Sequence, residues 1–134
     1  QIQTKSLAQI AQENLEVLSE LDLSEETLRT YCGKLVDYEY IDDPDDLVTG
    51  KYVRWLRISS PDAAMQGSSE AIAVEPRLVT GGKLMDVRYQ DNGDAMLIVF
   101  VGNHRVTQLR FEHFLIFQKL SQEEQVILYM LGQR

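Results

Sequence analysis

The first part of the chain has hydrophobic residues at three- and four-residue steps. Between Ser6 and Leu21 they form one stripe, as expected for an amphipathic helix. A second stripe runs from about Glu25 to about Tyr38, and Ser24 just before it is a suitable N-cap. Because only Asp22 and Leu23 connect the two stripes, the pattern predicts an antiparallel pair of helices.

The period changes after Gly50 to one typical of strands. Residues 51–58 are rich in β-branched and aromatic side chains, and residues 83–89 alternate between apolar and polar positions. The run 95–101 is entirely apolar, which predicts a central strand covered on both faces. The sequence Asn92-Gly93 before it favours a hairpin turn. Further strand candidates are residues 71–74, 106–111 and 114–117.

Two segments without strand or helix periodicity punctuate this pattern. Residues 42–46 read Asp-Asp-Pro-Asp-Asp, and their spacing lacks the register of a calcium loop, so a solvated turn is favoured. Residues 59–69 contain a proline, a glycine and two serine pairs and are expected to form a long loop.

The last element is a short helix from about Gln122 to Leu131. Ser121 and Glu124 make a capping box at its start. Its apolar residues need a surface to cover, and one end or face of the sheet is the expected one; they are Val126, Ile127, Met130 and Leu131.

Together these elements predict an α+β fold. We expect an N-terminal helix pair, a small antiparallel β-barrel or curled meander of five to six strands, and a short C-terminal helix. Residues 1–46 would form an acidic helical segment and residues 47–134 a β-rich domain, the two making one compact unit.

The composition is that of one ordinary domain. The chain has 134 residues, 44% of them hydrophobic, which is enough for a core without a metal or disulfide. A single cysteine, Cys32, cannot form an internal disulfide, so a reducing compartment such as the cytoplasm is expected. The longest apolar run falls far short of the roughly 20 residues of a membrane helix, and no signal peptide opens the chain, so no membrane association is expected.

Charge is unevenly distributed. The net charge is −8, and residues 1–50 hold three basic and twelve acidic side chains. Such a segment repels phosphates, which disfavours nucleic acid as a ligand there, and it would suit a partner protein with a basic surface.

Motifs for catalysis or for binding cofactors and metals are absent from the sequence. The two histidines, His104 and His113, have no cysteine or histidine at metal-ligand spacing. Cys32 lies within the second helical stripe and is interpreted as a small core residue. We therefore predict a protein that is not an enzyme, with no catalytic residues, no cofactor and no metal.

A small set of cationic and aromatic residues on the predicted strands supports an alternative function, the binding of nucleic acid. Small barrels present such residues to nucleic acids, stacking bases on aromatic rings while cations track phosphates. The candidate contacts for nucleic acid or a protein partner are Arg54, Arg57, Arg88, Arg110, Tyr52 and Tyr89.

Three short motifs carry a resemblance. They are Gly50 to Leu56 (GKYVRWL), Leu78 to Leu84 (LVTGGKL) and Leu115 to Leu120 (LIFQKL). Over about residues 50–120 the chain resembles small β-rich proteins of large double-stranded DNA viruses of eukaryotes. The resemblance implies a minor capsid or virion component without a cofactor, located in the virion or host cytoplasm, and it carries over no functional residues.

The favoured hypothesis is a non-catalytic structural or adaptor protein that contacts other proteins of a larger assembly. The alternative is a small-barrel nucleic-acid-binding or regulatory module. Convergence of Arg54, Arg57, Arg88 and Arg110 on one face, beside an exposed Tyr52 or Tyr89, would favour the alternative.

Overall fold

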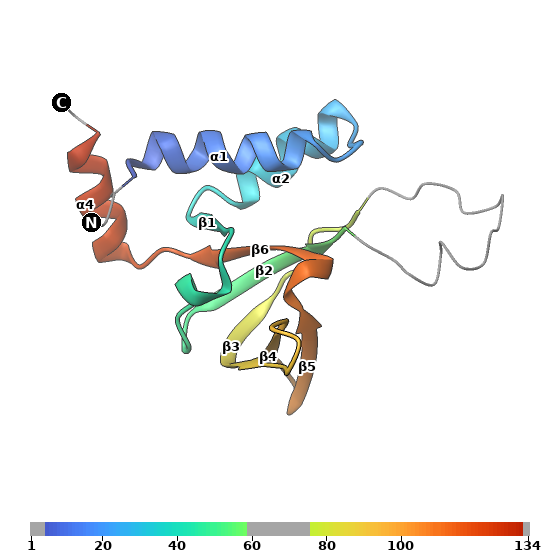
Figure 1. The fold of residues 1–134 in the computed structure, drawn as a ribbon. Coiled ribbons are helices and arrows are strands. Elements are labelled where there is room, and N and C mark those ends of the chain that lie inside the picture. The colour runs from blue at the N-terminus through green and yellow to red at the C-terminus, as the bar shows by residue number, and fades with distance from the viewer. Residues whose placement is uncertain (1–4, 59–75, 133–134) are drawn as a thin grey trace, which may run out of the picture.

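The structure is a computed structural model that describes residues 5–58 and 76–132. Two helices lie over one part of a curled sheet, and a third stands at its side (Figure 1). The helices are α1 (Leu7–Ser19), α2 (Glu25–Lys34) and α4 (Gln122–Leu131), and short 3-10 turns are η1 (Pro44–Asp46) and η2 (Phe111–His113). The strands are β1 (Tyr38–Ile41), β2 (Tyr52–Arg57), β3 (Gly82–Tyr89), β4 (Ala95–Gly102), β5 (Arg105–Arg110) and β6 (Phe114–Lys119).

Side-chain caps fix the starts of the helices. The Ser6 and Ser121 hydroxyls accept hydrogen bonds from the backbone of Gln9 and Glu124, whose side chains bond back in both cases. Ser24 caps α2, as its sequence position predicts. The α4 bounds match the prediction, whereas α2 ends at Lys34 rather than near Tyr38 because the chain turns there and enters a strand.

The six strands form one antiparallel sheet in the order β1-β6-β2-β3-β4-β5. Strands β2 to β5 are consecutive neighbours, and β6 then returns to lie between β2 and β1. The sheet is curled but not closed. The prediction of an α+β fold with a curled antiparallel sheet is confirmed, and the barrel alternative gives way to an open sheet.

Strand β1 has no counterpart in the sequence prediction. It pairs with β6 from Tyr38↔Lys119 to Ile41↔Ile116, so the acidic N-terminal segment contributes an edge strand to the sheet. On its other edge β1 meets α1, where the Asn14 amide donates to the Tyr38 carbonyl oxygen (3.0 Å) and accepts from the Tyr40 amide (3.0 Å). The Asn14 side chain therefore serves this edge as a neighbouring strand would.

Tight connections hold the strands in register. The β4–β5 turn has Asn103 and His104 at φ 52° and 59°, the pattern of a type I′ hairpin turn. At the entry to β3, Gly81 has φ +94°, and a Cβ there would lie 2.0 Å from the Val53 carbonyl oxygen. Only glycine fits such a close approach of two backbones.

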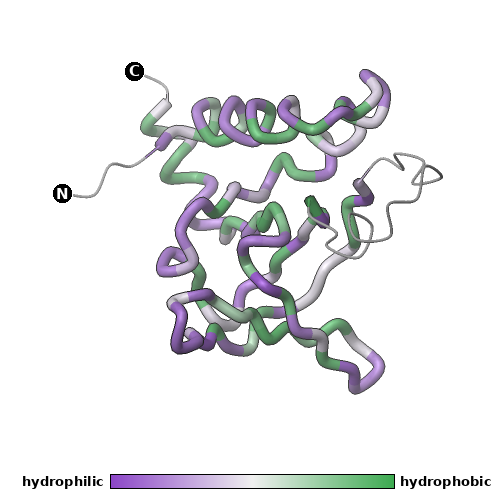
Figure 2. The backbone as a smooth tube through the Cα atoms, turned by 45° about the vertical axis from the view of Figure 1, so that its right-hand side comes forward, coloured by the Kyte–Doolittle hydropathy of each residue, from purple (hydrophilic) through white to green (hydrophobic). Residues whose placement is uncertain are grey.

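Two apolar clusters occupy opposite faces of the sheet. The inner cluster, around which the sheet curls, consists of Val53, Trp55, Leu84, Leu97, Val99, Leu109 and Ile116. The outer cluster lies beneath α1 and α2 and consists of Leu18, Leu35, Tyr38, Leu56, Leu78, Leu115 and Phe117. Green and purple stretches alternate along α1, in keeping with a helix that buries one side (Figure 2). The two clusters share the strands between them, which ties helices and sheet together.

The outer face of β4 corrects one prediction. Its inner residues are buried, but Met96 and Ile98 are only half-buried and Phe100 is exposed, because α1 and α2 lie over the opposite part of the sheet. The apolar run 95–101 is thus covered on one face rather than both. The predicted loop 59–69 and strand 71–74 lie outside the described residues.

Candidate functional site: an acidic groove beside helix α4

Tyr52, Arg54 and Arg57 lie on β2, but not on one face of it. Tyr52 and Arg54 are on the outer face, where the Arg54 Nε donates to the Val79 carbonyl oxygen (2.9 Å) and the guanidinium lies 6.0 Å from the Tyr38 ring. Arg57 has the inner-face register and stacks 5.2 Å over the Phe114 ring. Both arginines are thus used in packing the protein itself.

Arg88 and Arg110 lie at the far end of the sheet. By register they stand on either side of Met96 on the outer face. Each has acidic neighbours: the Arg88 Nε is 3.1 Å from Asp86, and the Arg110 Nη1 is 3.7 Å from Asp94 and 3.8 Å from Glu112. These carboxylates offset the positive charge that phosphates would require.

Tyr89 is also engaged with an acid. Its hydroxyl donates to the Asp45 carboxylate, and this hydrogen bond, with the nearby negative charges of Asp45 and Asp43, raises the pKa of Tyr89 to about 12. The six residues selected from the sequence therefore do not form one basic surface with exposed aromatic rings.

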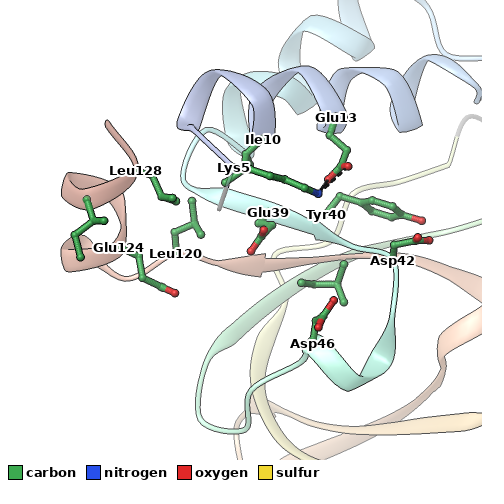
Figure 3. Close-up of a pocket in the computed structure, with 12 residues that line it drawn as sticks. Lys5, Ile10, Glu13, Glu39, Tyr40, Asp42, Asp46, Leu120, Glu124 and Leu128 are labelled. Atoms are coloured by element: carbon green, nitrogen blue, oxygen red, sulfur yellow. Dashed lines mark hydrogen bonds and ion pairs between the residues drawn. The ribbon is translucent and has the colours of Figure 1, made fainter. Parts of the chain in front are cut away.

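A groove lies elsewhere, between the start of α1, the edge strand β1 and helix α4 (Figure 3). Its volume is about 480 Å³. The lining residues are Lys5, Ile10, Glu13, Glu39, Tyr40, Ile41, Asp42, Asp46, Leu120, Glu124, Ile127 and Leu128. We call it the acidic groove because five of these residues carry carboxylates and one carries an ammonium group.

The floor of the acidic groove is apolar. Ile10 from α1, Leu120 before α4 and Leu128 from α4 form a small cluster of buried side chains. This cluster is separate from the two that support the sheet. It places α4 against α1 and leaves the groove open beside it.

Two of the five carboxylates in the acidic groove have cationic partners. Lys5 lies 2.8 Å from Glu13, and Lys51 lies 2.5 Å from Glu124. Burial alone would raise the pKa of Glu124, but hydrogen bonds from Lys51 and Ser121 outweigh it and lower that pKa. Glu13 on α1 and Glu124 on α4 thus stand on two walls of the groove (Figure 3).

Glu39 lies between those walls (Figure 3). Its carboxylate is half-buried and has no hydrogen-bond partner within residues 5–58 and 76–132. Burial raises its pKa, Glu124 and Glu13 raise it further, and Lys5 and Lys51 act in the opposite sense. Glu39 is therefore a half-buried carboxylate without an ion-pair partner in the described part of the chain, although Lys5 and Lys51 are near enough to act on its pKa.

Helix α4 continues the groove as an exposed apolar surface. Only Leu128 of its ten residues is buried. The prediction that its apolar residues cover the sheet is wrong, because Leu128 is the one apolar residue of α4 that is buried, and it packs with Ile10 and Leu120 at the side of the sheet. The exposed large side chains are Val126, Ile127, Tyr129, Met130 and Leu131.

Other reactive groups of the described chain do not assemble. Within residues 5–58 and 76–132, no group of three or more histidine, cysteine, aspartate or glutamate side chains is arranged to hold a metal ion. Burial raises the pKa of the Cys32 thiol, which lies at the margin of the outer cluster, and a raised pKa lowers its thiolate fraction. His104 is exposed in its turn and His113 ends η2.

Within residues 5–58 and 76–132, no helix has the length and apolar character required to cross a membrane.

Sequence reasoning missed the acidic groove because its residues come from three distant segments. One signal was available: six consecutive apolar or aromatic residues, 126–131, exceed the single stripe that a packed helix buries. Glu39 had no comparable signal, because its environment depends on the unrecognised strand β1 and on α4.

Comparisons with known proteins add no relative. Neither protein-family models, nor curated protein sequences, nor solved structures give a match to this chain.

Proposed function

We propose that this protein is a non-catalytic structural or adaptor protein that binds another protein at the acidic groove and the exposed side of α4. The exposed apolar surface of α4 carries this proposal. Its Val126, Ile127, Tyr129 and Met130 are each more than half exposed, at 51–66%. Contiguous exposed apolar residues beside a groove are typical of protein interaction sites, since water contact with them costs free energy that a partner removes.

The types of residue on α4 support the same proposal. Aromatic residues and methionine are enriched in the centres of protein interfaces, and α4 exposes one of each, Tyr129 and Met130. Acidic groups along the groove would form the polar rim that surrounds such a centre. A binding function of this kind needs no reactive group.

The nature of the larger assembly rests on the sequence resemblance. On that basis we propose a minor virion component of a large DNA virus, acting in the virion or the host cytoplasm. The nucleic-acid alternative gains no specific support, because the arginines that would carry it are packed on aromatic rings or lie next to carboxylates.

The test compares complexes formed by wild type and by a polar variant of α4. The Val126→Ser/Met130→Ser variant changes two exposed side chains and should fold normally, as checked by circular dichroism. Val36→Ser is the matched control, because Val36 is 72% exposed, lies on the connection after α2 and does not line the acidic groove.

The tagged proteins would be purified under mild conditions from cells of the native source, and the complexes sized by light scattering. We expect a partner at fixed stoichiometry with wild type and with Val36→Ser, and its loss with the α4 variant. A partner retained equally by all three proteins would refute the proposed role of α4. A monomer carrying an oligonucleotide would favour the nucleic-acid alternative.

A further inference from the structure

We infer that the acidic groove accepts an amphipathic helix with lysine or arginine along one side, supplied by the partner protein. This inference rests on the proposed function and names the chemistry of the partner. It follows from three features of the groove: its apolar floor, its unpaired carboxylates and the covered edge of β1.

The apolar side of the groove favours an occupant with an apolar face. Ile10, Leu120 and Leu128 are buried beneath the groove, and Ile127 stands half exposed at its side. A partner side chain placed against Ile127 would remove apolar surface from water, which favours binding. An entirely polar segment would gain nothing from contact with Ile127.

The unpaired carboxylates favour a cationic occupant. Glu13 and Glu124 are paired with Lys5 and Lys51, but the side chains of Glu39, Asp42 and Asp46 have no ion-pair partner within the described ranges 5–58 and 76–132. These three carboxylates lie along β1 and η1, on one side of the apolar floor (Figure 3). A cation that approaches Glu39 replaces water at a site where the charge is already poorly hydrated, so the pair is less screened than a surface pair.

The edge of β1 favours a helix over an extended peptide. An extended peptide would add to the sheet by bonding outward-facing backbone groups of the edge strand. At Tyr38 and Tyr40 the Asn14 side chain already occupies two of these groups. A helix satisfies its own backbone hydrogen bonds and needs none from β1, and its apolar stripe can face the floor while its cations reach the carboxylates.

The probe for this inference is a synthetic helix of leucine and lysine, about 18 residues long, with leucine on one face. Two peptides serve as references: one with glutamate in place of lysine, and one with the leucine–lysine composition scrambled so that no apolar face remains. Binding to the full chain would be followed by fluorescence anisotropy. We expect the leucine–lysine helix to bind at least about tenfold more tightly than either reference.

Substitutions in the protein then locate the site. Glu39→Gln should weaken the leucine–lysine helix about three- to tenfold, and Ile127→Ser should weaken it similarly. Glu123→Gln is the matched control: it removes the same charge from the exposed first turn of α4, outside the groove, and should leave the affinity unchanged. Thermal unfolding of each variant would verify that it is folded.

The inference is overturned if the leucine–lysine helix binds no more tightly than the references, or if Glu39→Gln changes the affinity no more than Glu123→Gln does. In the second case, binding would reflect only attraction to a protein of net charge −8. If the natural partner is still lost when α4 is made polar, the proposed function stands and only the class of partner is wrong. If α4 substitution has no effect on the partner, the proposed function fails first.

Discussion

Replacing Asn14 by leucine should destabilise the protein substantially. Asn14 is 4% exposed, and its amide nitrogen lies 3.0 Å from the Tyr38 oxygen and 3.4 Å from the Leu35 oxygen, while its amide oxygen accepts from the Tyr40 amide. Leucine has the same branching and the same number of side-chain heavy atoms, but its methyl groups can neither donate nor accept. The variant therefore removes all three hydrogen bonds of this side chain while it keeps the branched shape.

The expected magnitude follows from the groups left without partners. The Leu35 oxygen keeps its bond from the Tyr38 amide (2.9 Å), so the Tyr38 oxygen and the Tyr40 amide are the groups left unpaired. Each unpaired buried group costs about 1–3 kcal/mol, and the added apolar surface of leucine offsets part of that cost. We expect a net loss of about 2–4 kcal/mol, a large share of the 5–15 kcal/mol typical of a domain.

Urea unfolding would measure this loss. The chain has one tryptophan, Trp55, and its ring is buried on β2, so its fluorescence reports on the sheet. Gln12→Leu is the control, because Gln12 is an exposed amide on the same helix and its substitution should change stability by less than about 0.5 kcal/mol. Hydrogen exchange at the Tyr40 amide should accelerate in Asn14→Leu alone. An unchanged unfolding midpoint and unchanged Tyr40 exchange would refute the idea that Asn14 holds the strand edge.

Three further predictions concern single groups. Glu39→Gln should raise the urea midpoint at pH 7, because a carboxyl whose pKa is raised by folding destabilises the folded state when it is ionised. Below pH 4 both proteins carry a neutral group at this position, so the gain in stability should vanish. A gain that persists at low pH would contradict this cause. Gly33→Ala within α2 should stabilise the protein by about 0.5–1 kcal/mol, since a Cβ there meets no atom within 4 Å. Gly81→Ala should destabilise it by more than about 2 kcal/mol, because a Cβ there would collide with the Val53 carbonyl oxygen. Equal unfolding temperatures for the two variants would show that the backbone at Gly81 moves to accommodate the Cβ at no cost. Alkaline absorbance titration should show a phenol that ionises near pH 12 and is missing from Tyr89→Phe, and an unchanged titration of that variant would argue against the hydrogen bond to Asp45.

Local sequence signals predicted the elements that have their own helix caps or turn residues. Ser24 and the pair Ser121 and Glu124 marked helix starts that the structure contains, and the Asn92-Gly93 turn separates β3 from β4. These signals work because caps and hairpin turns depend on a few adjacent residues.

Strand β1 lacked such a signal. It follows α2 after three residues, with no glycine between, and its strand conformation comes from pairing with β6 near the other end of the chain. The acidic groove was not predicted for the same reason, since Ile10, Glu39 and Leu128 become neighbours only in the folded chain. Burial was also predicted wrongly for apolar residues that no other element covers, such as Phe100 on β4 and Met130 on α4, which are exposed.

The pairing of β1 with β6 has a consequence for synthesis on the ribosome. Every other strand is translated between the two partners, and chains grow at roughly 5–20 residues per second. For several seconds the N-terminal helices would have no completed sheet to pack on, and their apolar residues Leu18 and Leu35, fully buried in the end, would face solvent or a chaperone. Truncations before Phe114 are therefore expected to expose a hydrophobic N-terminal segment that aggregates or is degraded.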